Sequence, residues 1–406
     1  MINSYSYGGL FRNDMAWFQG DAVRKNPNLK PETTISKEIG AEVRLLDGRL
    51  TADVTYYDKY ARDQIVESEL SYLSNYQRVI INSGKISNKG WEISVSGVPV
   101  KVKNFEWKTI FNWSKNNSMV ESLPEGIDKI QIGSGVYNVK SYAEVGKPYG
   151  AIYAKTFKRD AEGYILCQLD GSPKEGQDYE YLGCVQADWR GGWNNVFRLG
   201  NFSFSVMFDF QKGGKFFSQT SIQSSVDGQS VKSLEGRDAD FFSRKILGES
   251  DEERYGFMRP QNANTPTANG QIYPDWGRPK GVVLPNCRYD EDVEGLAGQQ
   301  VLGYCTPERY WMHYTSRDIS RFIYDASYVK LREITVSYDL PKKWLRKTPF
   351  QTFRVAAVGR NIATLFANTP HGLDPQATST TGNAQGFERG FNLPSATYGF
   401  DIKVSF

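Results

Sequence analysis

One-by-one alternation of apolar and polar residues is the feature of this chain that most restricts its fold. From Ile35 to Leu45 the odd positions are mostly apolar, whereas the even positions are polar, charged or glycine. Asp47-Gly48 follows, a pair that suits the positive φ angles of a tight hairpin turn, and the alternation resumes from Leu50 to Tyr57. Because successive side chains of a strand point to opposite faces, this period predicts an antiparallel hairpin with one apolar and one polar face.

The same alternation recurs along the chain. It is clearest from Phe202 to Gln211, where Phe and Val occupy the even positions, and a tight Leu199-Gly200-Asn201 link precedes this segment. Further alternating segments are 91–96, 105–114, 189–198, 333–338, 353–360 and 398–406, with weaker ones at 136–143 and 147–158. The pattern predicts an all-β, antiparallel fold of about eleven strands.

The connections between these segments alternate in length. Short ones lie near 46–49, 98–104, 144–147, 199–201 and 340–351, and long ones near 61–85, 117–135, 159–187, 214–324 and 364–393. Short turns at one end of the strands and long loops at the other are typical of outer-membrane β-barrels. The spacing therefore favours a transmembrane β-barrel.

Composition excludes several other classes of protein. No apolar run approaches the roughly 18–20 residues of a membrane-spanning helix, and the mean hydropathy is −0.52. With 49 basic against 46 acidic residues the net charge is only +3, which argues against nucleic-acid binding. The two histidines, His313 and His371, lie far apart, so we expect neither a histidine-based metal site nor a catalytic triad, and no enzyme. Residues 1–7 carry no export signal, which predicts either a cytoplasmic chain or one whose signal lies upstream.

A soluble β-sandwich is the alternative fold, because its sheets also alternate. In a sandwich the polar face is the outside, whereas in a barrel it lines the lumen. The unequal loops and the absence of a helical repeat favour the barrel, as do aromatic residues at strand ends, which are Tyr56, Tyr57, Tyr60, Trp107, Trp113, Tyr338 and Tyr398.

Several motifs resemble those of a known family. The segment Asn26-Pro27-Asn28-Leu29-Lys30-Pro31-Glu32-Thr33 resembles the entry to a barrel strand in TonB-dependent outer-membrane receptors, and Asn82 to Lys85 with Asn88 to Glu92 resembles their next strand. The SusC/RagA branch is indicated by further matches, at 188–195, 213–215, 328–335 and 358–362. Phe406, after alternating Phe400, Ile402 and Val404, is similar to the signal for barrel assembly.

This resemblance implies that residues 1–406 are the C-terminal portion of a 22-stranded barrel, without its plug and N-terminal strands. An open half-barrel has two unpaired edges, so we expect the chain alone neither to close nor to transport. The implied function is TonB-dependent import of an oligosaccharide or a peptide across the outer membrane. The implied partners are the remainder of the receptor, a SusD-like lipoprotein, and the TonB complex, contacted through the missing N-terminal part. No cofactor is implied. A secreted or surface β-rich module that binds glycans or peptides is the alternative function.

The polar face of the expected barrel carries both signs of charge. Its predicted lumen-facing residues are Glu38, Glu42, Arg44, Asp53, Arg354, Arg360, Asp401 and Lys403. Such a mixture suits a lumen that holds a plug by ion pairs and hydrogen bonds, whereas an ion-selective channel would carry rings of one sign.

The longest connection, 214–324, contains the candidate ligand-binding residues. Aromatic rings can stack on sugars or peptide side chains, and this loop holds Tyr273, Trp276, Tyr310, Trp311 and His313. The alternative is that each of these residues simply packs the loop onto the barrel or a neighbouring protein, because aromatic side chains bury large areas.

Cysteines and carboxylates in the long loops suggest two further features. A local disulfide between Cys167 and Cys184 and another between Cys287 and Cys305 are the simplest pairing, with free thiols as the alternative.

Asp290 opens a run of carboxylates that begins like a calcium loop, but Val301 stands where the bidentate glutamate should be. We therefore expect a solvated acidic turn and no metal site.

Overall fold

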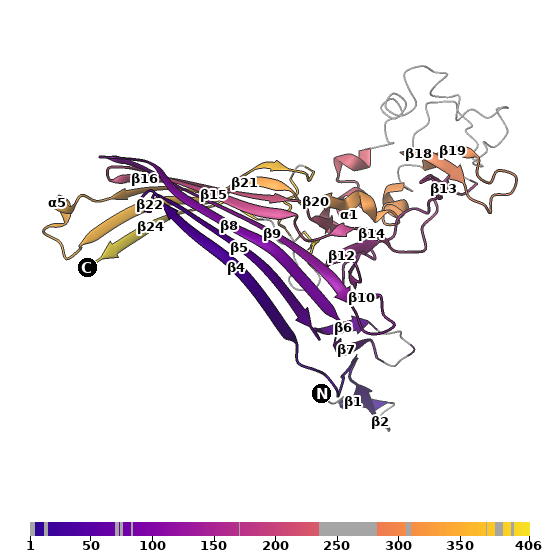
Figure 1. The fold of residues 1–406 in the computed structure, drawn as a ribbon. Coiled ribbons are helices and arrows are strands. Elements are labelled where there is room, and N and C mark those ends of the chain that lie inside the picture. Colours follow the sequence, from indigo (N-terminus) through magenta and orange to yellow (C-terminus); the bar gives the residue numbers. More distant parts are fainter. Residues whose placement is uncertain are drawn as a thin grey trace, which may run out of the picture.

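Nine long strands form one antiparallel sheet in the computed structural model of the chain. The structure describes residues 5–11, 15–69, 73, 76–82, 84–169, 171–234, 282–305, 310–370, 372–377, 385–390 and 394–406. The strands of the sheet are β4 (Thr33–Leu45), β5 (Leu50–Arg62), β8 (Lys85–Val102), β9 (Phe105–Ser122), β15 (Trp189–Leu199), β16 (Phe202–Lys212), β21 (Tyr328–Asp339), β22 (Thr352–Ala367) and β24 (Thr397–Ser405). Each pairs with its neighbour in this order, and Figure 1 shows them side by side as one curved sheet with β4 and β24 at its edges.

The predicted all-β, antiparallel fold is confirmed, but the estimate of about eleven strands is too high for this sheet. Segments 136–143 and 147–158 contain β11 (Lys140–Glu144) and β12 (Ala151–Ala154), which pair in a separate sheet with β10 (Lys129–Ser134) and β14 (Glu180–Cys184). These strands have four to six residues each, fewer than the roughly 9–11 that a barrel strand needs to cross a membrane. The link at 144–147 is therefore not a barrel turn.

The two ends of the sheet differ in the length of the connections between its strands. The links after β4, β8 and β15 are short, and the link after β21 holds only the short helix α5 (Lys342–Leu345). All four lie at the same end, together with the C-terminus, and the smaller sheets gather at the opposite end, called the loop end below (Figure 1). The predicted alternation of short turns and long loops is thus present in the fold.

Small strands and short helices occupy the loop end. The strands are β1 (Tyr5–Phe11), β2 (Met15–Gly20), β3 (Val23–Arg24), β6 (Ile65–Glu69), β7 (Arg78–Asn82), β13 (Ile165–Cys167), β17 (Lys215–Ser218), β18 (Val282–Tyr289), β19 (Gln300–Cys305), β20 (Ile323–Asp325) and β23 (Phe387–Glu388). The helices are α1 (Gln219–Val226), η2 (Val231–Leu234), η3 (Tyr310–Tyr314) and η4 (Ile319–Phe322). Among the residues described, no helix combines the length and the apolar character needed to cross a membrane.

The first hairpin turn lies where the sequence predicts it. Pairing between β4 and β5 ends at Leu45 and Leu50, so the turn comprises residues 46–49. Leu46, Asp47 and Gly48 have φ angles of 55°, 53° and 80°. Only glycine adopts such angles without steric cost, so Asp47-Gly48 marks the turn correctly although Leu46 takes part in it as well.

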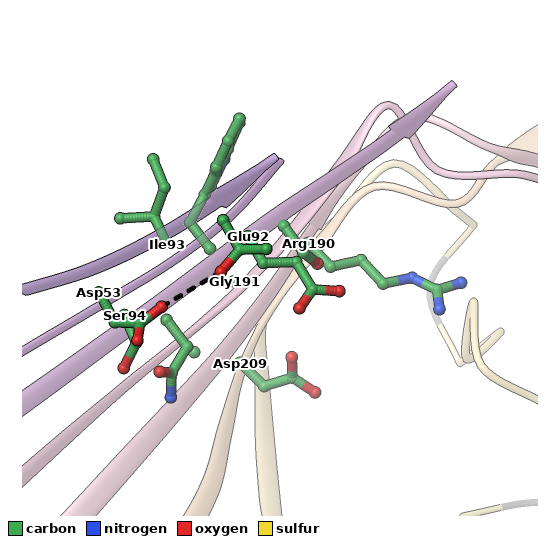
Figure 2. Close-up of a pocket in the computed structure, with 12 residues that line it drawn as sticks. Asp53, Glu92, Ile93, Ser94, Arg190, Gly191 and Asp209 are labelled. Carbon is green, nitrogen blue, oxygen red and sulfur yellow. Dashed lines mark hydrogen bonds between the residues drawn. The ribbon is translucent and has the colours of Figure 1, made fainter. Parts of the chain in front are cut away.

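Strand register separates apolar and polar residues onto opposite faces of the sheet. One row of cross-strand partners reads Val43, Ala52, Val95, Phe111, Trp193, Phe208 and Leu331. The adjacent row reads Glu42, Asp53, Ser94, Asn112, Gly192, Asp209 and Lys330. Figure 2 shows Ile93 on one side of the strands and Asp53, Glu92 and Asp209 on the other. The alternation in the sequence therefore produces a sheet with one apolar and one polar face. We call this nine-stranded sheet the wall.

The apolar face of this wall is exposed, which rules out the sandwich fold. Val336 is 48% exposed and Phe400 is 86% exposed. The largest buried core, which includes Ile152, Phe217 and Phe322, takes no residue from the nine-stranded sheet. In a sandwich the apolar rows would form that core, whereas a barrel wall leaves them free to contact lipid.

Two polar side chains on the apolar face are hydrogen-bonded by tryptophans. The indole Nε1 of Trp107 donates to Asn195 Oδ1 at 3.1 Å, and that of Trp193 donates to Thr109 Oγ1 at 2.9 Å. A polar group without a partner is costly in hydrocarbon. These two bonds allow Asn195 and Thr109, which are cross-strand partners, to lie within an otherwise apolar surface.

Candidate functional site

The predicted lumen residues all lie on the polar face of the sheet. Cross-strand pairing joins Glu42 to Asp53 and Arg354 to Lys403, and Glu38, Arg44, Arg360 and Asp401 occupy equivalent alternating positions on β4, β22 and β24. Several are paired with charges: Arg44 Nε lies 2.7 Å from Glu42, Arg354 Nε lies 2.7 Å from Asp339, and Arg360 Nε lies 3.0 Å from Glu333. Their placement follows the alternation, and their role in holding a plug stays a prediction.

Among the described residues, three cavities open on the polar face toward the loop end of β15. One of about 400 Å³ is lined by Asp53, Glu92 and Asp209 among others, and Figure 2 shows these carboxylates on one side of the sheet. A second, of about 510 Å³, lies between the wall and residues of the long loops, and a third measures about 240 Å³. Arg190 lines all three, so it lies where they meet.

Arg190 is held by the strand that carries it. It is the second residue of β15, where Ser114 of β9 and Gln211 of β16 are its cross-strand partners. Its Nε donates to Gln211 Oε1 at 3.0 Å. In the sequence, Arg190 lies within the motif at 188–195, and its position between Trp189 and Gly191, which belong to the apolar face, already indicates that it faces the lumen.

A segment of the connection between β22 and β24 folds back onto the wall beside these cavities. We call residues 372–377 the strap. Lys330 of β21 donates through Nζ to both carboxylate oxygens of Asp374, at 2.5 and 2.6 Å, and to Gln376 Oε1 at 2.9 Å. Arg332 donates through Nη2 to Gln376 Oε1 at 2.7 Å and through Nε to Asp209 at 3.1 Å. The strap thus fixes one side of the second cavity, which Gln376 lines.

A buried carboxylate anchors the other described part of the same connection. Glu388 of β23 accepts hydrogen bonds from the hydroxyls of Ser218 and Thr220, at 2.5 and 2.6 Å, and from the backbone N–H of Thr220 at 3.2 Å. These donors lie at the start of α1, where backbone N–H groups attract negative charge. Beside this anchor, Gln385 and Gly386 line the second cavity.

The structure corrects part of the predicted ligand-binding set. Tyr310 and Trp311 are only 1% and 2% exposed and belong to the main core of the loop end, so they pack the loops and offer no open ring face. His313 is exposed on η3, and its role is untested. Tyr273 and Trp276 lie outside the described residues.

The predicted disulfides do not fit the strand pairing. Cys184 of β14 has a free thiol that contacts the backbone carbonyl of Tyr149, and Cys167 lies in β13, which belongs to a different sheet. Cys287 pairs with Val301 across β18 and β19, whereas Cys305 pairs with Val282. At about 3.3 Å per residue, the Cα atoms of Cys287 and Cys305 lie roughly 13 Å or more apart, beyond the approximately 7 Å limit for a disulfide. Adjacency in the sequence was misleading because Cys167 and Cys184 lie in different sheets and the register of β18 and β19 separates Cys287 from Cys305.

The acidic turn at Asp290 is held by lysines. Nζ of Lys158 and Nζ of Lys174 each lie 2.8 Å from Asp290 Oδ2, and Lys174 also contacts Asp292. Burial alone would raise the pKa of the Asp290 carboxyl, but these hydrogen bonds and one from the Glu291 N–H lower it to about 2. The turn is therefore an ion-pair cluster that joins the loop containing β13 to the loop containing β18.

We expect Asp290→Asn to lower the melting temperature at pH 7. Because the pKa of Asp290 is depressed to about 2 from a usual 3.8, its contribution is fully present above about pH 4 and is lost as the pH falls through the folded-state value. The difference between wild type and variant should therefore be constant from pH 7 to 4 and shrink toward pH 2. Melting followed by tryptophan fluorescence across this range measures it. Glu294→Gln, at an exposed position of the same turn, serves as the control, and a difference that grows with acidification would contradict the assignment.

Comparison with known proteins agrees with this architecture. A family model described as "TonB dependent receptor-like, beta-barrel" matches residues 3–362. TonB-dependent receptor P3 of Formosa agariphila is 25% identical over 395 residues, covering 92% of this chain and 33% of that protein. TonB-dependent receptor SusC of Bacteroides thetaiotaomicron is 28% identical over 104 residues, covering 25% of this chain and 10% of that protein. The chain spans about a third of the length of the first of these relatives.

Solved structures show the same fold. The structure of the RagAB peptide transporter aligns with a TM-score of 0.63 at 16% sequence identity, covering 100% of this chain and 38% of that one. A structure of the RagAB peptide importer in its closed-closed state aligns with a TM-score of 0.62 over the same shares. At this identity the likeness concerns the arrangement of strands.

Proposed function

Because this chain belongs to the family of TonB-dependent receptor-like β-barrels, we propose that it forms part of the wall of an outer-membrane importer for an oligosaccharide or a peptide. The observation that carries the proposal is the two-faced sheet. Its apolar face is exposed as a lipid-facing wall requires, and its polar face bears cavities that converge on Arg190. No reaction is needed for this role, since import depends on binding and release.

The remaining parts of the proposed importer lie outside this chain. Relatives such as TonB-dependent receptor P3 are about three times as long, so we propose that further barrel strands complete the wall between the edges β4 and β24 and that a plug fills the lumen. We further propose that the TonB complex supplies the energy. A SusD-like lipoprotein is the proposed partner at the loop end, an expectation supported by the likeness to SusC.

Uptake by intact cells tests the proposal. We expect cells that lack the complete receptor containing this chain to lose uptake of its labelled oligosaccharide or peptide, and cells that lack TonB to show the same loss. Cells complemented with the receptor provide the control. Uptake that persists without TonB would contradict the mechanism. Cooperative folding of the isolated chain as a monomer without detergent would instead favour the alternative of a secreted or surface binding module.

A further inference from the structure

The cavities around Arg190 lie against the wall itself. Within the part of the chain that the structure describes, no carboxylate lies within salt-bridge distance of Arg190, and only its Nε is engaged, by Gln211. Its two Nη groups are therefore available to a ligand. Since a guanidinium recognises a carboxylate through two parallel hydrogen bonds, Arg190 is suited to bind a carboxylate.

Negative charge lies at a fixed distance from this guanidinium. Glu92, Ser114 and Arg190 are successive partners across β8, β9 and β15, so the Cα atoms of Glu92 and Arg190 are about 10 Å apart at roughly 4.8 Å per strand. Asp53, whose partner on β8 is Ser94, lies two residue rows from Glu92 and lines the same cavity. Asp209 also lines it, but Arg332 already engages that carboxylate. The lining thus offers a cation on one side and two carboxylates on the other.

Side-chain amides occupy the surface around Arg190. The second cavity is lined by Gln211, Gln376 and Gln385, and the first by Asn112. Gln211 is engaged by Arg190 and by two backbone carbonyls, and Gln376 is engaged by Lys330, Arg332 and Tyr328. The amides of Asn112 and Gln385 can donate to and accept from the backbone of a peptide, which offers both kinds of group. Tyr328 and Phe216, which also line the second cavity, are buried, and the tryptophans at the cavities, Trp113 and Trp189, alternate onto the apolar face. Among the described residues, these cavities therefore present no open ring face of the kind that would favour a sugar.

We propose that these cavities bind a short zwitterionic peptide or the end of a longer one. The C-terminal carboxylate binds Arg190, and the α-ammonium group or a basic side chain lies toward Glu92 and Asp53. About three residues in extended conformation, at 3.3–3.6 Å each, span the distance between the two charged sides. The amides of Asn112 and Gln385 bind the backbone between them. This assignment rests on the proposed importer function and narrows its substrate class to peptides.

Calorimetric titration of the complete receptor, purified in detergent, tests the assignment. The probes are the tripeptide Ala-Gln-Ala, its C-terminal amide, its N-acetyl form, and trigalacturonate as a carbohydrate with carboxylates. Amidation and Arg190→Gln should each weaken binding about 10–100-fold, the range of a charge-assisted hydrogen bond. The amidated peptide should bind wild type and Arg190→Gln with equal affinity, because neither complex contains the ion pair between Arg190 and a C-terminal carboxylate. Glu92→Gln should likewise weaken binding of the free tripeptide, because the variant lacks the carboxylate that faces the α-ammonium group. This variant should therefore bind the tripeptide and its N-acetyl form with equal affinity.

Arg198→Gln is the matched control. Arg198 lies on the same face of β15 but at its other end, where it pairs with Asp339 at 3.4 Å, so tripeptide binding should be unchanged. Arg190→Lys retains the charge without the paired donors and should restore part of the affinity, which separates recognition from folding. Unchanged tripeptide affinity in Arg190→Gln, or no tripeptide binding by wild type, would overturn the assignment. Arg190-dependent binding of trigalacturonate alone would overturn it in favour of an acidic glycan.

Uptake measured on the same variants separates this site from the importer function. TonB-dependent peptide uptake that Arg190→Gln leaves intact would overturn the site and leave the importer standing. Loss of uptake in Arg190→Gln, with uptake retained in Arg198→Gln, supports both. Absence of any TonB-dependent uptake by wild type would refute the importer, and the assignment that rests on it, whatever the calorimetry shows.

Discussion

Arginine in place of Val95 is expected to lower the free energy of unfolding of the complete receptor by about 2–4 kcal/mol, whereas arginine in place of Ser96 should leave it nearly unchanged. The two residues are neighbours in β8 and both are half-buried. Val95 belongs to the apolar row with Ala52 and Phe111, so an arginine there projects its charge toward hydrocarbon. An arginine at position 96 enters the polar face, where water and other charges surround it.

Urea unfolding of the receptor in lipid vesicles measures both variants, with the heat-induced shift in gel mobility as a check on assembly. The comparison is informative because adjacent positions share secondary structure, strand length and depth, and differ only in the face they occupy. Equal destabilisation by Val95→Arg and Ser96→Arg would mean that both faces are dry. Greater destabilisation by Ser96→Arg would mean that the lumen and lipid faces have been assigned in reverse.

The two-faced wall could be predicted from the sequence because it depends on local information. Period-two alternation fixes which side chains share a face, and tight turns such as Gly200-Asn201 fix the register of neighbouring strands. The strand count was less accurate, because short strands such as β12 alternate too little to be told from barrel strands. Motif resemblance then identified the receptor family, and the family match over residues 3–362 confirms it.

The site was only partly predictable, because it combines residues far apart in the chain. The orientation of Arg190 follows from alternation, but its cavities also need Gln376 and Gln385, which come from a loop that begins more than 150 residues later. No local pattern indicates where such a loop folds. Aromatic residues in the loop predicted the ligand-binding residues poorly for the same reason. The rings of Tyr310 and Trp311 could stack on a ligand, but the surrounding loops bury them. Packing within the loops decides which residues remain available to a ligand.

Asp374→Ala should destabilise the strap by about 3 kcal/mol, because it leaves the buried ammonium of Lys330 without its carboxylate partner. The loss is expected to be local, since the strap touches the wall through few side chains. At the Ala377 N–H, which donates to the backbone carbonyl of Asp374 at 3.0 Å, about 3 kcal/mol corresponds to roughly hundredfold faster hydrogen exchange. Exchange followed by mass spectrometry on peptides covering 372–377 measures the effect.

Removing both charges should cost less than removing the carboxylate alone. Lys330→Met combined with Asp374→Ala eliminates the unpaired ammonium, and methionine fills a similar volume, so exchange at Ala377 should slow again relative to Asp374→Ala. Lys212→Met, at an exposed lysine on neighbouring β16, is the control and should change stability by less than about 0.5 kcal/mol. If the double variant exchanges as fast as Asp374→Ala, the unpaired ammonium is not the cause of the loss, and the strap depends on the hydrogen bonds of the Asp374 carboxylate itself. If both variants exchange as slowly as wild type, the strap is held by its backbone, and the second cavity keeps its shape without the ion pair.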